Sequence, residues 1–192
     1  MTALRRATPD DHDHVVALPD LGGATRRLLA KDLAGEVPRH AVVAVDDGEV
    51  VGFAMETRQP DEVHLLDIVV RPDHRRHGIG RRLVTALAAL GAADGATAMT
   101  LEARVSNPGG PPMYRHLGFT DSGVRPGYYQ DGEDAFVMWH HDLGVLARAA
   151  DADDLSALGV ASVVAPRPTG PVRVPDLDEL ETERDTTTGR VG

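Results

Sequence analysis

The chain has 192 residues, enough for one folded domain of ordinary size with a terminal extension. Acidic residues outnumber basic ones by 30 to 20, so the net charge is -10 at pH 7 and broad binding to nucleic acid is not expected. Cysteine is absent, which excludes disulfides, thiolate metal sites and a cysteine nucleophile. Neither a signal peptide nor a membrane-spanning run is visible, so we expect a cytoplasmic protein that does not bind membranes.

Capping and turn signals divide the chain into helices and strands. Thr8-Pro9-Asp10-Asp11 is typical of a helix start, and Asp46-Asp47-Gly48-Glu49 between two β-branched runs predicts a hairpin. The pattern predicts helices at 10–18, 25–33, 81–93 and 113–117, and strands at 4–7, 41–45, 50–55, 63–70, 97–105 and 135–140. This order indicates an α/β domain with one mixed β-sheet.

The composition changes near residue 143. Beyond it, proline, threonine and acidic residues dominate and aromatic residues vanish. We therefore expect residues 1–143 to form the domain and residues 144–192 to form a largely disordered acidic tail, with marginal helix near 146–158.

An arginine- and glycine-rich loop follows the strand predicted at 63–70. Between Arg71 and Arg82, five arginines stand against one acid, Asp73. A helix N-terminus offers unpaired backbone N–H groups, and glycines let an anion approach the backbone closely. Strand, loop and helix in this order predict a pyrophosphate site, although a short R-x-x-G-x-G string also occurs in ordinary surface turns.

Three motifs in a fixed order carry a resemblance to a known superfamily. They are Arg75-x-x-Gly78-x-Gly80 after an apolar strand, Ser106-Asn107, and Tyr114-Arg-His-Leu-Gly118-Phe119. This set resembles the acyl-CoA-binding core of the GCN5-related N-acetyltransferase (GNAT) superfamily. Segments 101–107, 128–129 and 133–138 are similar to its RimI-type branch, which acetylates the N-terminal amine of a ribosomal protein. The resemblance covers about residues 2–143 and implies a GNAT-like mixed sheet flanked by helices, with acetyl-CoA as the acyl donor.

The resemblance also implies roles for individual residues. Glu102 matches the catalytic base of that branch, and Tyr114 would lie beside the coenzyme sulfur as the acid. Backbone groups of the strand would hold the pantetheine arm, the loop would hold the pyrophosphate, and Asn107 would bind pantetheine from the other side. The implied coenzyme-binding residues are Ile68, Val69, Val70, Arg75, Arg76, His77, Gly78, Ile79, Gly80, Arg81 and Asn107.

The chemistry of acetyl transfer asks for such groups independently. A protonated amine must lose a proton before it attacks a thioester, and a carboxylate such as Glu102 accepts it directly or through a water. A phenol such as Tyr114 can protonate the departing thiolate. The strand pattern alone favours a solvent-facing Glu102, and Tyr114 alone is typical of a core or rim aromatic. The surrounding motifs reverse this preference and favour the catalytic roles. Without cysteine or a G-x-S-x-G elbow, direct transfer is the simpler route.

One segment departs from the family pattern. Residues 108–113 read Pro-Gly-Gly-Pro-Pro-Met where the family has a helix-forming stretch. Proline and glycine disfavour helix interiors, so we expect this helix to begin only at Pro111 or Pro112, with Tyr114 in its first turn.

The acceptor side is less defined. Tyr128 and Tyr129 either line the acceptor channel or pack over the sheet, and the sequence does not decide between these two roles. The nine histidines include Asp11-His12-Asp13-His14, but adjacent and alternate ligands converge poorly from one element, so no metal is predicted.

We therefore expect an acetyl-CoA-dependent N-acetyltransferase acting on a primary amine, such as a protein or peptide N-terminus, as a monomer or homodimer. The alternatives are a small-molecule acetyltransferase, acting on a polyamine, amino sugar or antibiotic, and a non-catalytic acyl-CoA-binding module. Acetylation products from peptide and metabolite pools separate the first two.

Overall fold

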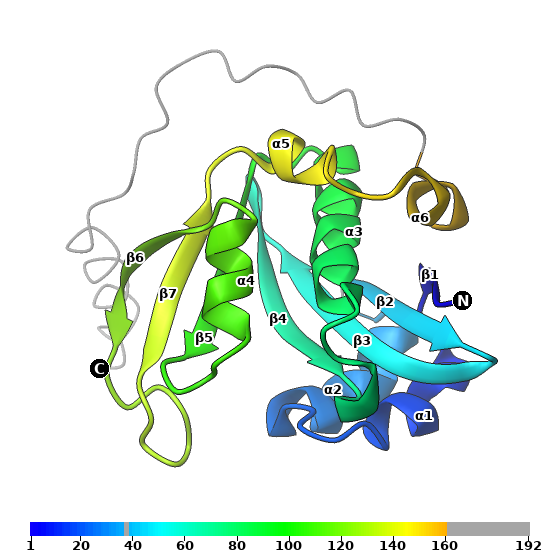
Figure 1. Cartoon of the computed structure of the whole chain (residues 1–192), viewed down its shortest axis with the longest axis horizontal. Helices are drawn as coiled ribbons and strands as arrows, with labels where there is room; N and C mark the ends of the chain where they lie inside the picture. The colour runs from blue at the N-terminus through cyan, green and yellow to red at the C-terminus, as the bar shows by residue number, and fades with distance from the viewer. Residues whose placement is uncertain (37–38, 161–192) are drawn as a thin grey trace, which may run out of the picture.

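The computed structural model describes residues 1–36 and 39–160, and a seven-stranded sheet is its centre (Figure 1). The strands are β1 (Ala3–Arg6), β2 (Arg39–Asp46), β3 (Glu49–Arg58), β4 (Glu62–Val70), β5 (Ala98–Arg104), β6 (Thr120–Arg125) and β7 (Ala135–His140). Their order across the sheet is β1-β2-β3-β4-β5-β7-β6. Among the strands of the described residues, the β4–β5 pair alone is parallel, so the predicted mixed sheet is confirmed.

Helices cover both faces of this sheet. They are α1 (His12–Val16), α2 (Gly23–Leu33), α3 (Ile79–Ala93), α4 (Gly110–His116), α5 (Leu143–Ala147) and α6 (Ala152–Ala157), with short 3-10 turns η1 (Pro9–Asp11) and η2 (Pro72–His74). None of the described helices has the length and apolarity needed to span a bilayer. The predicted hairpin joins β2 to β3, where Asp47 and Gly48 both have positive φ angles, as a tight primed turn requires.

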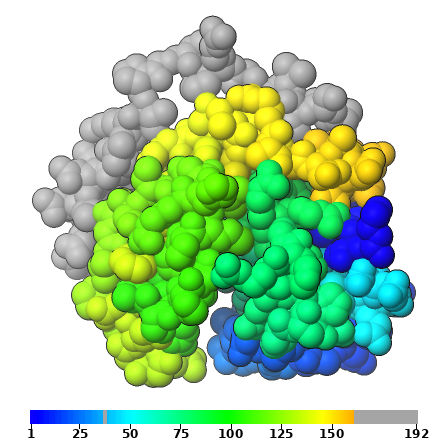
Figure 2. Space-filling model, viewed as in Figure 1, coloured from blue at the N-terminus to red at the C-terminus, as the bar shows by residue number. Residues whose placement is uncertain are grey.

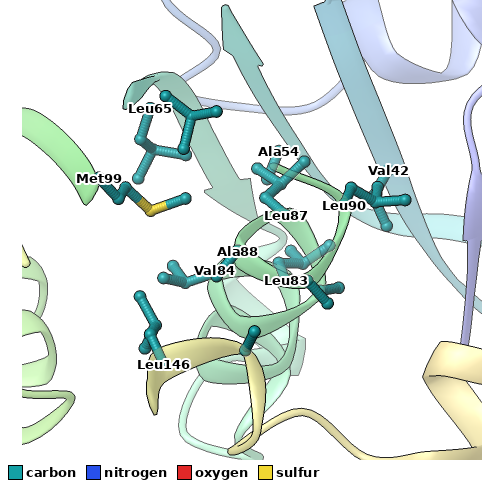
Figure 3. Close-up of a cluster of buried hydrophobic side chains, with 14 of the residues drawn as sticks. Val42, Ala54, Leu65, Leu83, Val84, Leu87, Ala88, Leu90, Met99 and Leu146 are labelled. Carbon is teal, nitrogen blue, oxygen red and sulfur yellow. The ribbon is translucent and has the colours of Figure 1, made fainter. Parts of the chain in front are cut away.

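Two hydrophobic cores lie on opposite faces of the sheet. On one face, Leu83, Val84 and Leu87 of α3 pack against strand residues such as Ala54 and Met99 (Figure 3). On the other face, α1 and α2 bury a smaller cluster that includes Val15, Leu29, Val43, Phe53 and Val69. Because side chains alternate along a strand, β2, β3 and β4 contribute residues to both cores.

The parallel pair β4–β5 separates part-way along its length. The two strands are paired from Glu62↔Ala98 to Leu65↔Leu101, and no pairing continues beyond that point although β4 runs on to Val70 and β5 to Arg104. Leu66 is an extra residue of β4 opposite β3, a β-bulge that bends the strand. In the space-filling view, a notch opens between the green to yellow-green surface of residues in β5–β7 and the teal and blue surface of α3 and the N-terminal helices (Figure 2).

The structure extends the packed region beyond the expected boundary at residue 143. Leu146 and Ala147 of α5 and the following Leu158 and Val160 are buried in the core on the α3 face. Arg82 of α3 holds Asp154 of α6 through two hydrogen bonds of 2.8 and 2.5 Å. The apolar spacing of Leu143, Leu146 and Ala147 gives this short segment one buried face despite its polar surroundings. The rest of the expected tail, residues 161–192, lies outside the described residues.

Candidate active site

A loop with unusual backbone geometry joins β4 to α3. Arg76 and Gly78 have φ angles of 68° and 80°, which turn successive backbone N–H groups toward one side. Within the described chain, the N–H groups of residues 76–81 donate to no backbone carbonyl, and the first intrahelical bond runs from Arg82 to Gly78. Since α3 has 15 residues, its positive N-terminal end adds to these donors. This arrangement of donors is one that can bind an anion.

The arginines of this loop have divided roles. Arg71 pairs with Glu49 and Asp73, Arg75 with Asp20, and Arg82 with Asp154, so three of the five charges are already balanced by carboxylates. Arg75 Nε also donates to the Val70 carbonyl at 2.8 Å, which ties the loop to the end of β4. In the described chain, Arg76 and Arg81 have no carboxylate partner, so they are the guanidinium groups best placed for a bound anion.

Tyr114 lies on the α3 face of the sheet, on the far side of the β4–β5 opening. It is almost fully buried, its ring meets Phe119 edge to face at 5.6 Å, and burial raises the pKa of its hydroxyl well above the ordinary value. The hydroxyl is therefore protonated at neutral pH, as a proton donor must be.

The Pro-Gly segment forms a helix earlier than expected. α4 begins at Gly110, not at Pro111 or Pro112, and Tyr114 is in its second turn instead of its first. Asn107 Oδ1 accepts hydrogen bonds from the N–H groups of Gly109 and Gly110 at 2.9 and 3.0 Å. This side chain satisfies the first helix donors and so compensates for the poor helix propensity. Asn107 thus holds α4 in place, and its amide nitrogen lies next to Gly110.

Glu102 lies on the opposite face, at the first β5 position beyond the pairing with β4. Its side chain is only 5% exposed, with Oε2 2.9 Å from His64 Nε2 and Oε1 2.7 Å from an Arg125 guanidinium nitrogen. Burial opposes ionisation of Glu102 and is the largest single effect, but His64, the charge of Arg125 and a hydrogen bond from Tyr128 together lower its pKa. Glu102 is therefore an anchored anion and does not point to bulk solvent.

A cavity of about 200 Å³ opens on this same face. It is lined by an apolar group, Ala24, Leu28, Met55, Leu65 and Leu66, and by a polar group, Thr25, Arg39, His64, Glu102 and Tyr128. Tyr129 does not line this cavity, because its ring lies under the Arg104 guanidinium, 3.9 Å from the ring centroid. The structure thus brings Tyr128, but not Tyr129, to the cavity.

The separated ends of β4 and β5 lie between the two halves of the site. Tyr114 and the anion loop are on the α3 side, whereas Glu102 and the cavity are on the α2 side. Backbone groups of residues 66–70 and 102–104 are unpaired toward each other, so an extended molecule can lie between them and hydrogen-bond both strands. Ile68, Val69 and Val70 belong to this stretch.

Comparison with known proteins identifies the family. A model of the acetyltransferase (GNAT) family matches residues 10–119. The chain belongs to this family and is an N-acetyltransferase. A Bacillus subtilis protein named putative ribosomal protein bS18-alanine N-acetyltransferase is 28% identical over 141 residues, covering 71% of this chain and 93% of that protein. The Escherichia coli K12 ribosomal protein bS18-alanine N-acetyltransferase is 37% identical over 95 residues, covering 48% of this chain and 64% of that protein.

Solved structures agree. The E. coli ribosomal-protein-S18-alanine N-acetyltransferase superposes with a TM-score of 0.63 at 27% identity, covering 72% of this chain and 92% of that one. Ard1 from Thermoplasma volcanium gives a TM-score of 0.65 at 28% identity, covering 72% and 96%. The GNAT family and the RimI-type resemblance expected from the motifs are thus confirmed.

In this acetyltransferase, the sequence motifs missed His64 and Arg39, which line the cavity, and Arg125, which pairs with Glu102. His64 had no local signal, because its place beside Glu102 depends on the register of the parallel β4–β5 pair. Arg39 stands at the start of a strand and has no motif. Arg125 belongs to β6, a strand that the sequence pattern did not predict. Within the described residues, no group of three or more histidines and acids is arranged to hold a metal ion.

Proposed function

We propose that this enzyme transfers the acetyl group of acetyl-CoA directly to the N-terminal amine of a protein or peptide. The observation that carries the proposal is the position of the Glu102 cavity, which lies on the α2 face beside the point where β4 and β5 separate, whereas Tyr114 and the loop before α3 lie on the α3 face. Three observations support acetyl-CoA as the donor. The chain belongs to the GNAT family, the N–H groups of residues 76–81 donate to no backbone carbonyl in the described chain, and the space beside Gly78 where a Cβ would stand is open.

Each part of the chain then has a defined task. The loop and the start of α3, with Arg75, Arg76, His77, Gly78, Ile79, Gly80 and Arg81, hold the pyrophosphate. Backbone groups of Ile68, Val69 and Val70 and the amide of Asn107 hold the pantetheine arm. Acetyl-CoA supplies the thioester whose carbonyl carbon the amine attacks.

Proton transfers complete the reaction. Glu102 provides the carboxylate that draws a proton from the acceptor ammonium, directly or through an intermediary. The nitrogen then forms a bond to the carbonyl carbon, the carbon–sulfur bond breaks, and the neutral Tyr114 hydroxyl donates a proton to the thiolate. The second proton that the nitrogen loses restores the Tyr114 hydroxyl, and the proton on Glu102 passes to solvent. No covalent acyl-enzyme is needed, because donor and acceptor meet from opposite faces of the sheet.

The cavity supports a chain terminus as the acceptor. Its volume is below the roughly 300–1,000 Å³ usual for whole small-molecule ligands, which suits one or two residues at the end of a chain. Its apolar wall accommodates a side chain, while His64, Glu102 and Tyr128 face the amine. The protein's negative charge favours a cationic terminus.

The test is a product screen by mass spectrometry. The purified enzyme and acetyl-CoA are incubated with peptides carrying each of the twenty N-terminal residues, with polyamines, amino sugars and aminoglycosides, and with the same peptides blocked at the N-terminus as controls. We expect acetylation of unblocked peptides only, lost in Glu102→Gln and weakened in Tyr114→Phe. Product from small amines alone establishes the small-molecule alternative, and coenzyme binding without any product establishes a non-catalytic module.

A further inference from the structure

His140, the last residue of β7, is a buried histidine to which the reaction above gives no part. Its side chain is on the face of the sheet that carries α3 and Tyr114, because it lies two residues after the core residue Met138. The residue is 7% exposed. Burial lowers the pKa of the His140 imidazole, so the ring is neutral at neutral pH. A polar ring buried among apolar side chains needs specific hydrogen-bond partners.

Both ring nitrogens of His140 are bound to backbone groups. Nδ1 accepts a hydrogen bond from the Asp142 backbone N–H at 3.3 Å, so Nε2 carries the hydrogen. Nε2 donates to the Leu117 carbonyl and lies 3.0 Å from the point where a Cβ of Gly118 would stand. Leu117 is the C-cap residue of α4, and the last carbonyls of a helix have no partner within the helix. His140 therefore ties the end of α4 to the chain that leads into α5.

A row of three rings runs from His140 to Tyr114. His140 meets Phe119 edge to face with ring centroids 5.4 Å apart, and Phe119 meets Tyr114 in the same way at 5.6 Å. Phe119 also donates its backbone N–H to the Tyr114 carbonyl at 3.0 Å. The Tyr114 ring lies 3.4 Å from the point where a Cβ of Gly110 would stand. Close packing thus sets the direction of the Tyr114 ring, and His140 supports that packing through Phe119.

α4 depends on such outside contacts for its position. It has seven residues with two prolines in its first turn, and helices of this length are not stable in isolation. Asn107 holds its start. Near its end, Arg115 pairs with Asp121 at 2.9 Å, but both side chains are 43% exposed and an exposed pair contributes little. The buried contacts of His140 are therefore the stronger restraint at this end of α4.

We propose, resting on the acetyltransferase function above, that His140 is a positioning residue for Tyr114. It holds the end of α4 and the Phe119 ring, so that the Tyr114 hydroxyl faces the opening between β4 and β5. His140 acts through Phe119 and the α4 backbone and exchanges no proton with either substrate. Precise placement matters for the reaction, because a displacement of about 1 Å in a catalytic group can lower a rate by about 10²-fold.

The experiment is a double-mutant cycle between His140 and Tyr114. His140→Leu keeps most of the volume but removes the ring and both hydrogen bonds, whereas Tyr114→Phe keeps the ring and removes the donated proton. Mass spectrometry measures turnover of the best peptide from the product screen by the wild type, both single variants and the double variant. We expect His140→Leu to lower kcat about five- to twentyfold when Tyr114 is present and by less than about twofold in the Tyr114→Phe background. Calorimetry should give an acetyl-CoA affinity within about threefold of the wild type for every variant.

Two further variants complete the design. His140→Gln places an amide N–H near the position of Nε2, so it should keep part of the Leu117 contact and lose less activity than His140→Leu. The same cycle is run with His140→Gln, which replaces His140→Leu if thermal unfolding shows that the leucine variant does not fold. His141→Gln is the control, since the His141 ring stacks on Trp139 at 5.7 Å, and it should match the wild type.

The outcomes separate this inference from the proposed function. A wild type that acetylates no amine overturns both. With an active wild type, an equal loss from His140→Leu in both backgrounds means that His140 stabilises the fold without directing Tyr114, and this inference alone fails. Turnover by Tyr114→Phe at the wild-type rate means that Tyr114 is not the acid, which also overturns the inference while acetyl transfer stands.

Discussion

The Asp67 carboxylate accepts a hydrogen bond from the Gly22 backbone N–H at 2.9 Å, which joins the start of α2 to β4. Asp67 follows the bulged residue Leu66, and Thr25 donates a second hydrogen bond to the same carboxylate. Burial raises the pKa of Asp67 above its usual range, and these donors work against that rise. This contact joins α2 to a strand of the Glu102 cavity, and Ala24, Thr25 and Leu28 of α2 form part of the cavity wall.

Gly22→Ala should therefore disturb acceptor binding without touching the coenzyme site. The new Cβ would lie 2.6 Å from Asp67 Oδ2, so the buried carboxylate must swing away and lose its donors. We expect a loss of about 1–3 kcal/mol in unfolding free energy and a severalfold higher acceptor KM, with acetyl-CoA affinity within twofold. The control is Gly23→Ala, whose Cβ meets only an Arg27 nitrogen at 3.7 Å. Equal acceptor KM values for the two variants would contradict a positioning role for this contact.

Gly78→Ala should weaken acetyl-CoA binding through backbone strain alone. Gly78 has φ +80°, and nothing lies within 4 Å of an added Cβ. With alanine at this position, the loop of the free protein leaves the left-handed conformation. Coenzyme binding must then restore that conformation, which costs about 1–2 kcal/mol and lowers the affinity about five- to thirtyfold. Gly95→Ala is the matched control, since Gly95 has φ +94° and equally open space at the far end of α3. Calorimetry should show a lower acetyl-CoA affinity for Gly78→Ala and an unchanged one for Gly95→Ala. Equal affinities of the two variants would show that the loop does not bind the coenzyme.

Features set by neighbouring residues could be predicted from the sequence, whereas features set by pairing between distant strands could not. The β2–β3 hairpin and the strand–loop–helix around Gly78 were predicted because turn glycines and periodic apolar residues act within a few positions. β6 was not predicted, because Thr120-Asp-Ser-Gly-Val-Arg has low strand propensity and becomes a strand by pairing with the edge of β7. The contact between His64 and Glu102 depends on a parallel register between strands separated by a whole helix, which no local pattern encodes.

The region after residue 143 gives a test of where the folded domain ends. Leu146 is 1% exposed and lies beside Val84 and Ala88 of α3 (Figure 3). Leu146→Ala should lower the unfolding free energy by about 2–5 kcal/mol, because it leaves a cavity in the main core. Val145→Ala on the same helix is the control, since Val145 is 48% exposed and should cost within about 0.5 kcal/mol. If denaturant unfolding gave the same midpoint for both, α5 would not contribute to the core.

Glu56 makes stability depend on pH at a distance from the catalytic groups. Its Oε1 lies 2.8 Å from His40 Nδ1, and Oε2 has no hydrogen-bond partner among the described residues. Burial raises the pKa of Glu56 from 4.5 to about 7, although the hydrogen bond and charge of His40 oppose the rise. Above pH 4.5 the unfolded chain releases this proton while the folded chain retains it. The contribution of Glu56 to stability is thus complete below pH 4.5 and is lost as the pH rises through about 7.

Glu56→Gln should remove this dependence, because glutamine keeps the shape and does not titrate. Between pH 5 and pH 8, the wild type should lose about 1–3 kcal/mol more unfolding free energy than the variant. Denaturant melts of both proteins across this range measure the difference directly, and subtraction cancels the titration of all groups that the two share. The exposed Asp10→Asn serves as control and should run parallel to the wild type. Parallel curves for Glu56→Gln and the wild type would mean that this buried carboxyl already ionises normally in the folded protein.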